Sequence, residues 1–243
     1  MAASTFGKRV YRFYLQLEGP KVPRGVGVMN PYRDRRVQGY VRQFLDRYFG
    51  DYRERALVMG INPGRFGAGV TGITFTDPVA MADFLGIPND LPRRRELSSI
   101  FIYDMIHRFG GPQAFYAKFF LTAISPLGYT RNGLNLNYYD EPALVKAVTP
   151  FIVDSLEKQI ALGCRRDVAF VLGFGTNRKF IEKLNAEQRF FDRIVALEHP
   201  RWIMQYRRRN LESYIDKYVE ALRSLEATAT THPNSADEPN DPR

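Results

Sequence analysis

The chain has 243 residues, with 35 lysines and arginines against 26 aspartates and glutamates, and a formal net charge of +9. This balance favours a polyanionic partner such as nucleic acid, and the single cysteine, Cys164, excludes an internal disulfide framework or a metal site built from several cysteines. No apolar stretch approaches the ~20 residues of a membrane span, and the N-terminus lacks the order of a secretion signal.

Short apolar segments alternate with segments of helical periodicity along the chain. Buried strands are predicted at 56–61, 119–124, 168–172 and 194–197. Helices are predicted at 37–48, 78–85, 97–109, 142–162 and 176–185, with a last one ending near residue 225, and a polar loop at 127–140. Asp77 and Pro78 have the pattern of an N-cap and a first helical residue. This order predicts an α/β fold, with a three-layer α-β-α architecture around a central four-stranded parallel sheet.

The composition also suggests how the chain is divided. Residues 1–226 are enough for a single domain with a sizeable core. The segment 227–243 is rich in Thr, Asn, Pro and Asp and has almost nothing apolar, so we expect a disordered tail there. The absence of a membrane span or secretion signal leads us to expect a soluble, intracellular protein, cytoplasmic if bacterial, with no membrane partner.

The first predicted strand breaks at Asn62 into a glycine-rich loop, residues 62–69. Glycines after a strand let backbone N–H groups approach a ligand closely. Asn62 is the polar side chain at the break, and Phe75 supplies an aromatic face further along. This combination is typical of a site that holds a flat, polar heterocycle, although asparagine also initiates turns that have no functional role.

Polar residues follow each of the predicted strands. Asn62 follows the first strand, 125–137 the second, 173–177 the third and His199 the fourth. Because the carboxyl ends of parallel strands meet at the ligand-binding edge of a sheet, we expect Asn62, His199 and parts of the second loop to converge there. A histidine before a proline is more often structural, but His199 is the one of the three histidines that follows a predicted strand.

Arginine supplies most of the positive charge and forms dense runs at 93–95, 165–166 and 207–209. The guanidinium group suits bidentate binding of phosphate. Each run is also compatible with an ordinary solvated face. The runs therefore favour contact with a nucleic-acid backbone without requiring it.

Residues 60–67 (Gly-Ile-Asn-Pro-Gly-Arg-Phe-Gly) and 71–75 (Thr-Gly-Ile-Thr-Phe) resemble the first motif of the uracil-DNA glycosylase superfamily. His199, with the proline that follows it, resembles the second motif. Asparagine in the first motif with histidine in the second is similar to the single-strand-selective monofunctional branch, whereas the mismatch-specific uracil/thymine branch carries asparagine in the second. The resemblance spans residues 56 to about 209.

The resemblance implies a uracil-DNA glycosylase fold and a monofunctional enzyme of base excision repair. Such an enzyme flips uracil out of single- or double-stranded DNA and hydrolyses its N-glycosidic bond, and we expect a monomer without metal or cofactor. No lysine stands at the matching catalytic positions, which argues against Schiff-base lyase activity.

The same resemblance assigns roles to individual residues. Asn62 would position the attacking water, by orientation rather than proton removal, because an amide is too weak a base. His199 would donate a hydrogen bond to the base oxygen next to the scissile bond and stabilise the developing anion. Phe75 would stack on the base, and backbone groups near Ile61 and Gly64 would contact its edge.

One departure from the family pattern concerns how the base is recognised. The family places a base-reading asparagine at the end of the second strand, where this chain has Ala123. An asparagine amide pairs with N3–H and O4 of uracil and so rejects cytosine. Asn135 is the candidate replacement, with Asn132 and Asn137 behind it, although a solvent-facing role fits them equally well. Other deaminated or oxidised bases are therefore expected as further substrates.

A second departure follows His199. The family continues with a small polar residue and a proline, whereas here an aromatic and arginine-rich segment follows. Extruding a base from a duplex costs a few kcal/mol, which inserted side chains can offset. We hypothesise that 201–206 forms such a wedge, with Trp202 or Met204 inserting; the alternative is that its apolar residues form the core face of the last helix. The candidate DNA-binding residues are Arg201, Trp202, Met204, Arg207 and Arg208.

Two other functions stay open on the sequence. The run 67–72 spells Gly-x-Gly-x-x-Gly, which is typical of a dinucleotide site when it opens directly into a helix. It starts several residues past the strand, which disfavours a nucleotide-binding enzyme. A non-catalytic DNA-binding protein on the same fold is the other alternative, because the usual base reader is missing.

Overall fold

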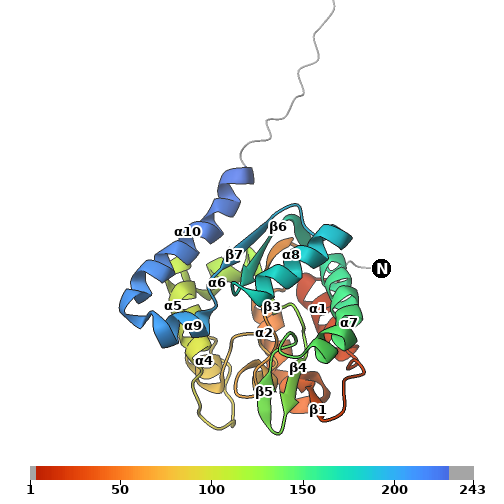
Figure 1. Ribbon diagram of the computed structural model, residues 1–243. Helices are drawn as coiled ribbons and strands as arrows, with labels where there is room; N and C mark the ends of the chain where they lie inside the picture. The colour runs from red at the N-terminus through yellow and green to blue at the C-terminus, as the bar shows by residue number, and fades with distance from the viewer. Residues whose placement is uncertain (1–3, 230–243) are drawn as a thin grey trace, which may run out of the picture.

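A computed structural model describes residues 4–229 of the chain. Its centre is a four-stranded sheet with the strand order β3-β2-β6-β7, in which every neighbouring pair is parallel (Figure 1). The strands are β2 (Arg55–Gly60), β3 (Phe119–Ala123), β6 (Cys164–Leu172) and β7 (Ile194–Leu197). They confirm the predicted sheet, and β6 begins four residues earlier than predicted.

Helices cover the sheet in two groups. The first group has α1 (Phe6–Leu15) in contact with α2 (Arg35–Tyr48) and α7 (Pro142–Ala161), and the second has α5 (Leu97–Phe109) in contact with α9 (Pro200–Tyr206) and α10 (Leu211–Ala229). Figure 1 shows α7 and α5 on opposite sides of the sheet, which confirms the three-layer α-β-α architecture. The remaining helices are α3 (Ala68–Thr71), α4 (Pro78–Asp83), α6 (Gly111–Tyr116), α8 (Thr176–Gln188) and the 3-10 helices η1 (Pro31–Arg33) and η2 (Arg208–Asn210).

The end of β2 is the part of the sheet that positions the first motif. Every residue of β2 is buried, as expected for a central strand covered by helices on both faces. The pairing with the β3 side continues past both strands, because the N–H of Ile124 donates to the Gly60 carbonyl at 3.0 Å and that of Ser125 to the Ile61 carbonyl at 3.1 Å. The chain therefore enters the glycine-rich loop from a fixed point.

Asp77 has the predicted place at the start of α4 and also joins that helix to α5. One carboxylate oxygen accepts from the Ala80 N–H at 2.8 Å, which confirms the N-cap. The other oxygen accepts from the Glu96 N–H at 2.8 Å, directly before α5. This buried carboxylate thus fixes the entry of both helices near the strand ends.

A second sheet corrects the prediction of a polar loop at 127–140. The strands β1 (Val26–Met29), β4 (Gly128–Arg131) and β5 (Leu134–Leu136) form an antiparallel sheet in the order β1-β4-β5. The β4–β5 turn contains Asn132 at φ 50° and Gly133 at φ 73°. An Asn-Gly pair with both residues in the left-handed region is the preferred two-residue hairpin turn. This pair was the signal in the sequence for a hairpin.

The helix α1, the strand β1 and the short α6 were also not among the predicted elements. In α1, Phe6, Val10 and Phe13 are buried and Thr5 caps the first turn by accepting from the Lys8 N–H at 3.4 Å. The last helix, α10, continues to Ala229, three residues into the range expected to be tail. The rest of that predicted tail, 230–243, lies outside the described residues. Within 4–229, no helix is long and apolar enough to cross a membrane.

Candidate active site

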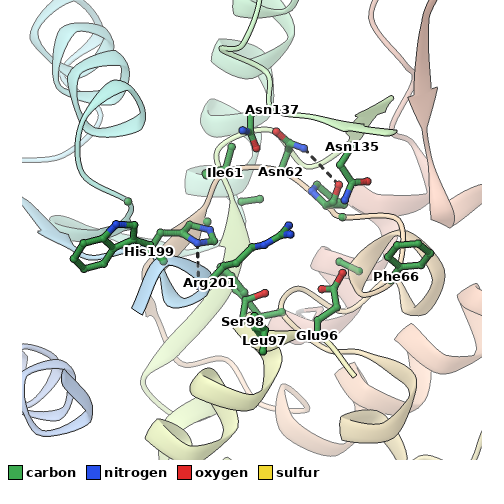
Figure 2. Close-up of a pocket in the computed structure, with 18 of the residues that line it drawn as sticks. Ile61, Asn62, Phe66, Glu96, Leu97, Ser98, Asn135, Asn137, His199 and Arg201 are labelled. Atoms are coloured by element: carbon green, nitrogen blue, oxygen red, sulfur yellow. Dashed lines mark hydrogen bonds between the residues drawn. The ribbon is translucent and has the colours of Figure 1, made fainter. Parts of the chain in front are cut away.

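A cavity of about 1000 Å³ opens at the carboxyl ends of the four parallel strands. Each strand contributes to its wall: Ile61 follows β2, Ala123 ends β3, Gly173 follows β6 and His199 follows β7. The strand ends therefore converge as the sequence predicted, and Asn62 lines the same cavity. Figure 2 shows the Asn62 and His199 side chains on the wall of this cavity, brought together from distant parts of the chain.

The Asn62 amide is fixed by backbone groups on both sides. Its Oδ1 accepts from the Tyr138 N–H at 3.0 Å, and its Nδ2 donates to the Leu136 carbonyl at 3.3 Å and to the Pro63 carbonyl at 3.4 Å. Because Oδ1 must face an N–H and Nδ2 must face carbonyls, the amide has a single consistent orientation. The second lone pair of Oδ1 stays available to a water.

The His199 ring is held in one tautomer by α9. His199 is the N-cap of that helix, and its Nδ1 accepts from the Arg201 N–H at 3.2 Å. Burial, reinforced by the positive charge of Arg201, lowers the pKa of His199 from 6.5 to about 4. The imidazole is therefore neutral at pH 7, and its proton is on Nε2. This arrangement leaves the side chain with an N–H donor on the ring edge away from the cap.

Phe75 lines the cavity from a strained position. Its φ of 55° is in the left-handed region, which is uncommon for a bulky residue and occurs mostly where function requires it. A Cβ at Gly60 would lie 2.7 Å from two atoms of the Phe75 ring, so the ring rests directly on the end of β2. Its centroid is 6.0 Å from that of the His199 ring.

The glycine-rich loop does not have the geometry of a dinucleotide site. Its run 67–72 forms the four-residue helix α3, which ends at Gly72 with φ 71°. The hydroxyl of the buried Thr71 donates to the Thr76 carbonyl at 2.7 Å and closes the loop on itself. A long helix opening directly from the strand, which phosphate binding requires, does not follow. This geometry opposes the nucleotide-binding alternative.

Comparison with known proteins places the chain in a family. Residues 47–223 match the model of the uracil DNA glycosylase superfamily. The chain belongs to that superfamily. Over 192 residues it is 28% identical to the single-strand selective monofunctional uracil-DNA glycosylase of Rattus norvegicus, covering 71% of this chain and 67% of the relative. Its structure resembles the crystal structure of wild-type SMUG2 from Pedobacter heparinus with a TM-score of 0.90 at 45% sequence identity, over 93% of this chain and 100% of that one.

Glu96 also lines the cavity, although the sequence interpretation did not include it. Its side chain extends into the cavity in Figure 2 and lies so close to the loop that a Cβ at Gly67 would be 2.3 Å from its Oε2. Burial, reinforced by the charge of Asp77, raises the pKa of its carboxyl, while Arg201 and Arg94 act in the opposite direction. Its place directly after the 93–95 arginine run was the one available signal.

The three asparagines that are candidates for recognising the base differ in their positions relative to the cavity. Asn135 lines the cavity, and its Oδ1 accepts from the Arg65 N–H at 3.1 Å, so its Nδ2 is left to donate. Asn137 also lines the cavity, but its Nδ2 donates to Asp140 at 3.1 Å. Asn132 is in the hairpin turn and is not among the lining residues. Ala123 lines the cavity without any polar side-chain atom.

The segment after His199 folds into α9, which places the candidate DNA-binding residues in different environments. Arg201 extends into the cavity in Figure 2, and Trp202, 38% exposed, is at its rim. Met204 is 5% exposed and belongs to the hydrophobic core, so the alternative that Met204 inserts into DNA is wrong. Because α9 has helical periodicity, Met204 faces inward while Trp202 faces outward. The exposed Arg207 and Arg208 lie beyond the cavity, with the Arg207 guanidinium 4.8 Å from the Trp202 ring centroid.

The residue types in the wall limit the chemistry that this cavity can perform. None of the described residues that line it is a lysine, so the wall offers no amine for a Schiff base. Within 4–229, no cluster of three His, Cys, Asp or Glu side chains has the arrangement of a metal site. What the wall does offer is a fixed amide, a neutral imidazole, an aromatic ring and a partly buried carboxyl.

Proposed function

We propose that this cavity hydrolyses the N-glycosidic bond of uracil that has been extruded from DNA. Membership of the uracil-DNA glycosylase superfamily makes the chain a hydrolase that acts on DNA. The observation that carries the finer proposal is the convergence of the oriented Asn62 amide and the Nε2–H tautomer of His199 on one cavity. The enzyme acts as a monofunctional glycosylase of base excision repair, and as a monomer without metal or cofactor.

The bond-breaking step needs a water in place and a stabilised leaving group. As the bond between N1 of uracil and the sugar breaks, the sugar becomes oxocarbenium-like and negative charge builds up on the base. Asn62 accepts a hydrogen bond from the attacking water through Oδ1, and the backbone contacts of its amide keep that acceptor pointing at one place. An amide removes no proton, so Asn62 contributes orientation, and the proton that the water loses as it bonds to the sugar goes to the departed uracil anion or to solvent.

His199 stabilises the departing base as an anion. Its Nε2–H donates to the base oxygen next to the scissile bond, where the negative charge grows. Because the pKa of His199 is far below neutral pH, the ring is a neutral imidazole, and its Nε2–H is too weak an acid to be transferred to the base anion. The donor is already oriented by the Arg201 N–H before the substrate arrives.

The remaining walls recognise the base. Phe75 stacks on its face, while backbone groups of Ile61 and Gly64 contact its edge. The free Nδ2 of Asn135 replaces the missing amide at position 123 and donates to a base carbonyl. A reader on an exposed hairpin holds the base less strictly than a buried amide, so other deaminated or oxidised bases enter as well.

Several cationic and aromatic groups around the cavity suit the DNA around the target base. Arg201, Arg207 and Arg208 meet the phosphates, and Trp202 packs against the bases beside the extruded one. The net charge of +9 steers the polyanionic substrate toward this face.

The test is excision from an oligonucleotide that contains one uracil, followed by alkaline cleavage of the abasic site. We expect strand scission with the native protein. For Asn62→Ala and His199→Ala we expect a rate constant that is lower by at least about 100-fold. Affinity for a duplex with an abasic analogue should change by no more than about twofold. His107→Ala is the matched control, because His107 is an exposed histidine of α5 outside the cavity.

Full activity of either active-site variant would refute that residue's role. If no scission occurs with uracil, xanthine or hydroxymethyluracil, the catalytic proposal fails. Tight binding to the same DNA would then favour a non-catalytic DNA-binding protein on this fold.

A further inference from the structure

Exposed apolar side chains gather at the mouth of the cavity. Within residues 4–229, seven large hydrophobic side chains are exposed, and four of them line this one cavity. The four come from three different elements and are Leu134, Phe174, Trp202 and Tyr206. Water-exposed apolar surface that is concentrated in one place marks an interaction site. Because Met204 is buried, the apolar contacts to DNA must come from this set.

Among these four side chains, Leu134 has the position that best suits insertion into a base stack. It is the first residue of β5, directly after the Asn132–Gly133 turn, so it lies at the tip of the hairpin. Its exposed fraction is 63%, and it is absent from the hydrophobic core of the described residues. By contrast, the Trp202 ring already contacts Tyr206, Tyr214 and the Arg207 guanidinium.

The hairpin is tied to the first motif along its whole length. At its tip, an Arg65 guanidinium nitrogen donates to the Gly133 carbonyl, and the Arg65 N–H donates to Asn135. At its base, the Nδ2 of Asn62 donates to the Leu136 carbonyl. Also at the base, a Cβ on Gly128 would lie 2.5 Å from the Pro63 carbonyl oxygen, so β4 rests directly on the loop. The position of Leu134 relative to the catalytic asparagine is therefore rigid.

The surroundings of the hairpin tip are cationic. The guanidinium groups of Arg65 and Arg94 lie 4.4 Å and 3.4 Å from the centroid of the Phe66 ring, and all three residues line the cavity. Two guanidinium groups on one ring concentrate positive charge beside the exposed leucine. This pairing of an apolar tip with a phosphate-binding surround is the composition with which proteins enter a base stack.

We propose that Leu134 enters the DNA base stack beside the extruded nucleotide, as a second wedge on the opposite side of the cavity from Trp202. Figure 2 shows Asn135, the neighbour of Leu134, and His199, which starts α9, on opposite sides of Asn62. The DNA is held open from both the β4–β5 hairpin and α9 while the base occupies the cavity. This proposal rests on the proposed glycosylase function.

The experiment compares excision of uracil from a duplex with excision from the same single strand. Leu134→Ala should lower the duplex-to-single-strand ratio of kcat/KM by about tenfold, because a duplex must be unstacked and a single strand need not be. Leu134→Met keeps an apolar tip and should retain most of the ratio. Leu15→Ala is the matched control, since Leu15 is another exposed leucine, on α1 and outside the cavity.

A second measurement separates insertion from a structural role of the hairpin. In a duplex that carries 2-aminopurine beside a non-cleavable uridine analogue, the native protein should raise the fluorescence by unstacking the probe, and Leu134→Ala should raise it less. An unchanged ratio of kcat/KM together with unchanged fluorescence would overturn the wedge. No excision by the native protein from either substrate would instead overturn the glycosylase function, so the two failures are distinguishable.

Discussion

At the scale of single residues, the proposed mechanism requires a neutral His199 that donates a hydrogen bond to the leaving base. Burial and the nearby Arg201 lower its pKa to about 4. An unfolded histidine titrates near 6.5, so the unfolded chain binds more protons than the folded one between pH 6.5 and pH 4. The stability that this group contributes is therefore complete above pH 6.5 and is lost as the pH falls toward 4.

We expect NMR titration of the His199 ring to give an apparent pKa near 4. Replacing Arg201 by Gln should raise that pKa toward 6.5, because it removes the neighbouring positive charge while the backbone N–H that fixes Nδ1 remains. A His199 pKa near 6.5 in the native protein would contradict the assignment of a neutral donor below that pH.

Gly60 leaves space for the Phe75 ring at the end of β2. A methyl group at this position would lie 2.7 Å from two ring atoms, and the positive φ of Phe75 leaves the ring little freedom to move away. Gly60→Ala should lower kcat/KM by about tenfold, through lost stacking on the base, and lower Tm as well. In a Phe75→Leu background the same substitution should cost much less stability; equal losses in both backgrounds would refute the collision.

Sequence reasoning found the residues whose chemistry is local to a strand end. Asn62 and His199 each follow a short apolar run, so the sheet rule alone brings them to one edge. Glu96 escaped it, because its place in the cavity depends on packing beside Gly67 and on the nearby charge of Arg201, which only the folded chain brings together. Met204 was misplaced because an apolar residue in a short helix faces the core or the solvent according to where that helix begins.

At the scale of elements, α9 begins directly after His199 and so joins the proposed donor to the proposed DNA-binding surface. Trp202 is two residues into this helix from Pro200, with its ring at the rim of the cavity. Trp202→Ala should lower excision from a duplex about tenfold and excision from a single strand much less, because only the duplex has to be opened. Equal losses on both substrates would contradict a wedge role, and Tyr52→Ala, an exposed aromatic away from the cavity, is the control.

The elements of the fold differ in how well the sequence predicts them. The parallel strands have continuous apolar runs, since helices cover both faces, and these runs located all four strands. The hairpin strands β4 and β5 are short, mixed in polarity and partly exposed, so periodicity gave no signal. Asn132–Gly133 is a local signal of the turn, whereas composition alone predicts only a polar loop.

At the scale of the whole molecule, the net charge does not distinguish arginines that are paired with carboxylates from arginines that are not. Arg165 is paired with Asp167 at 2.5 Å, and Arg93 and Arg95 both approach Asp83. Of the three runs, 207–209 has no ion pair among the described residues, and its Arg207 lies against Trp202, which lines the cavity. Net charge alone did not reveal this distinction.

DNA affinity should therefore fall steeply with salt and depend on particular arginines. Arg208→Gln should reduce the slope of log K against log salt concentration by about one, since one phosphate contact is lost. Arg165→Gln, which removes the same formal charge, should leave the slope unchanged because Asp167 already pairs with that side chain. Fluorescence anisotropy with a labelled duplex measures both, and equal slopes for the two variants would refute the distinction.

In the proposed mechanism, the N-cap role of His199 makes the direction of its Nε2–H depend on the position of α9. One imidazole both starts α9 and aims its remaining N–H, so the helix that meets DNA and the donor that meets the base cannot move independently. Any tilt of α9 on poorly fitting DNA turns the ring and misdirects that donor. In the proposed mechanism, recognition of the surrounding strand is therefore a precondition for bond cleavage, and a free base that enters the cavity without its strand leaves α9 unengaged.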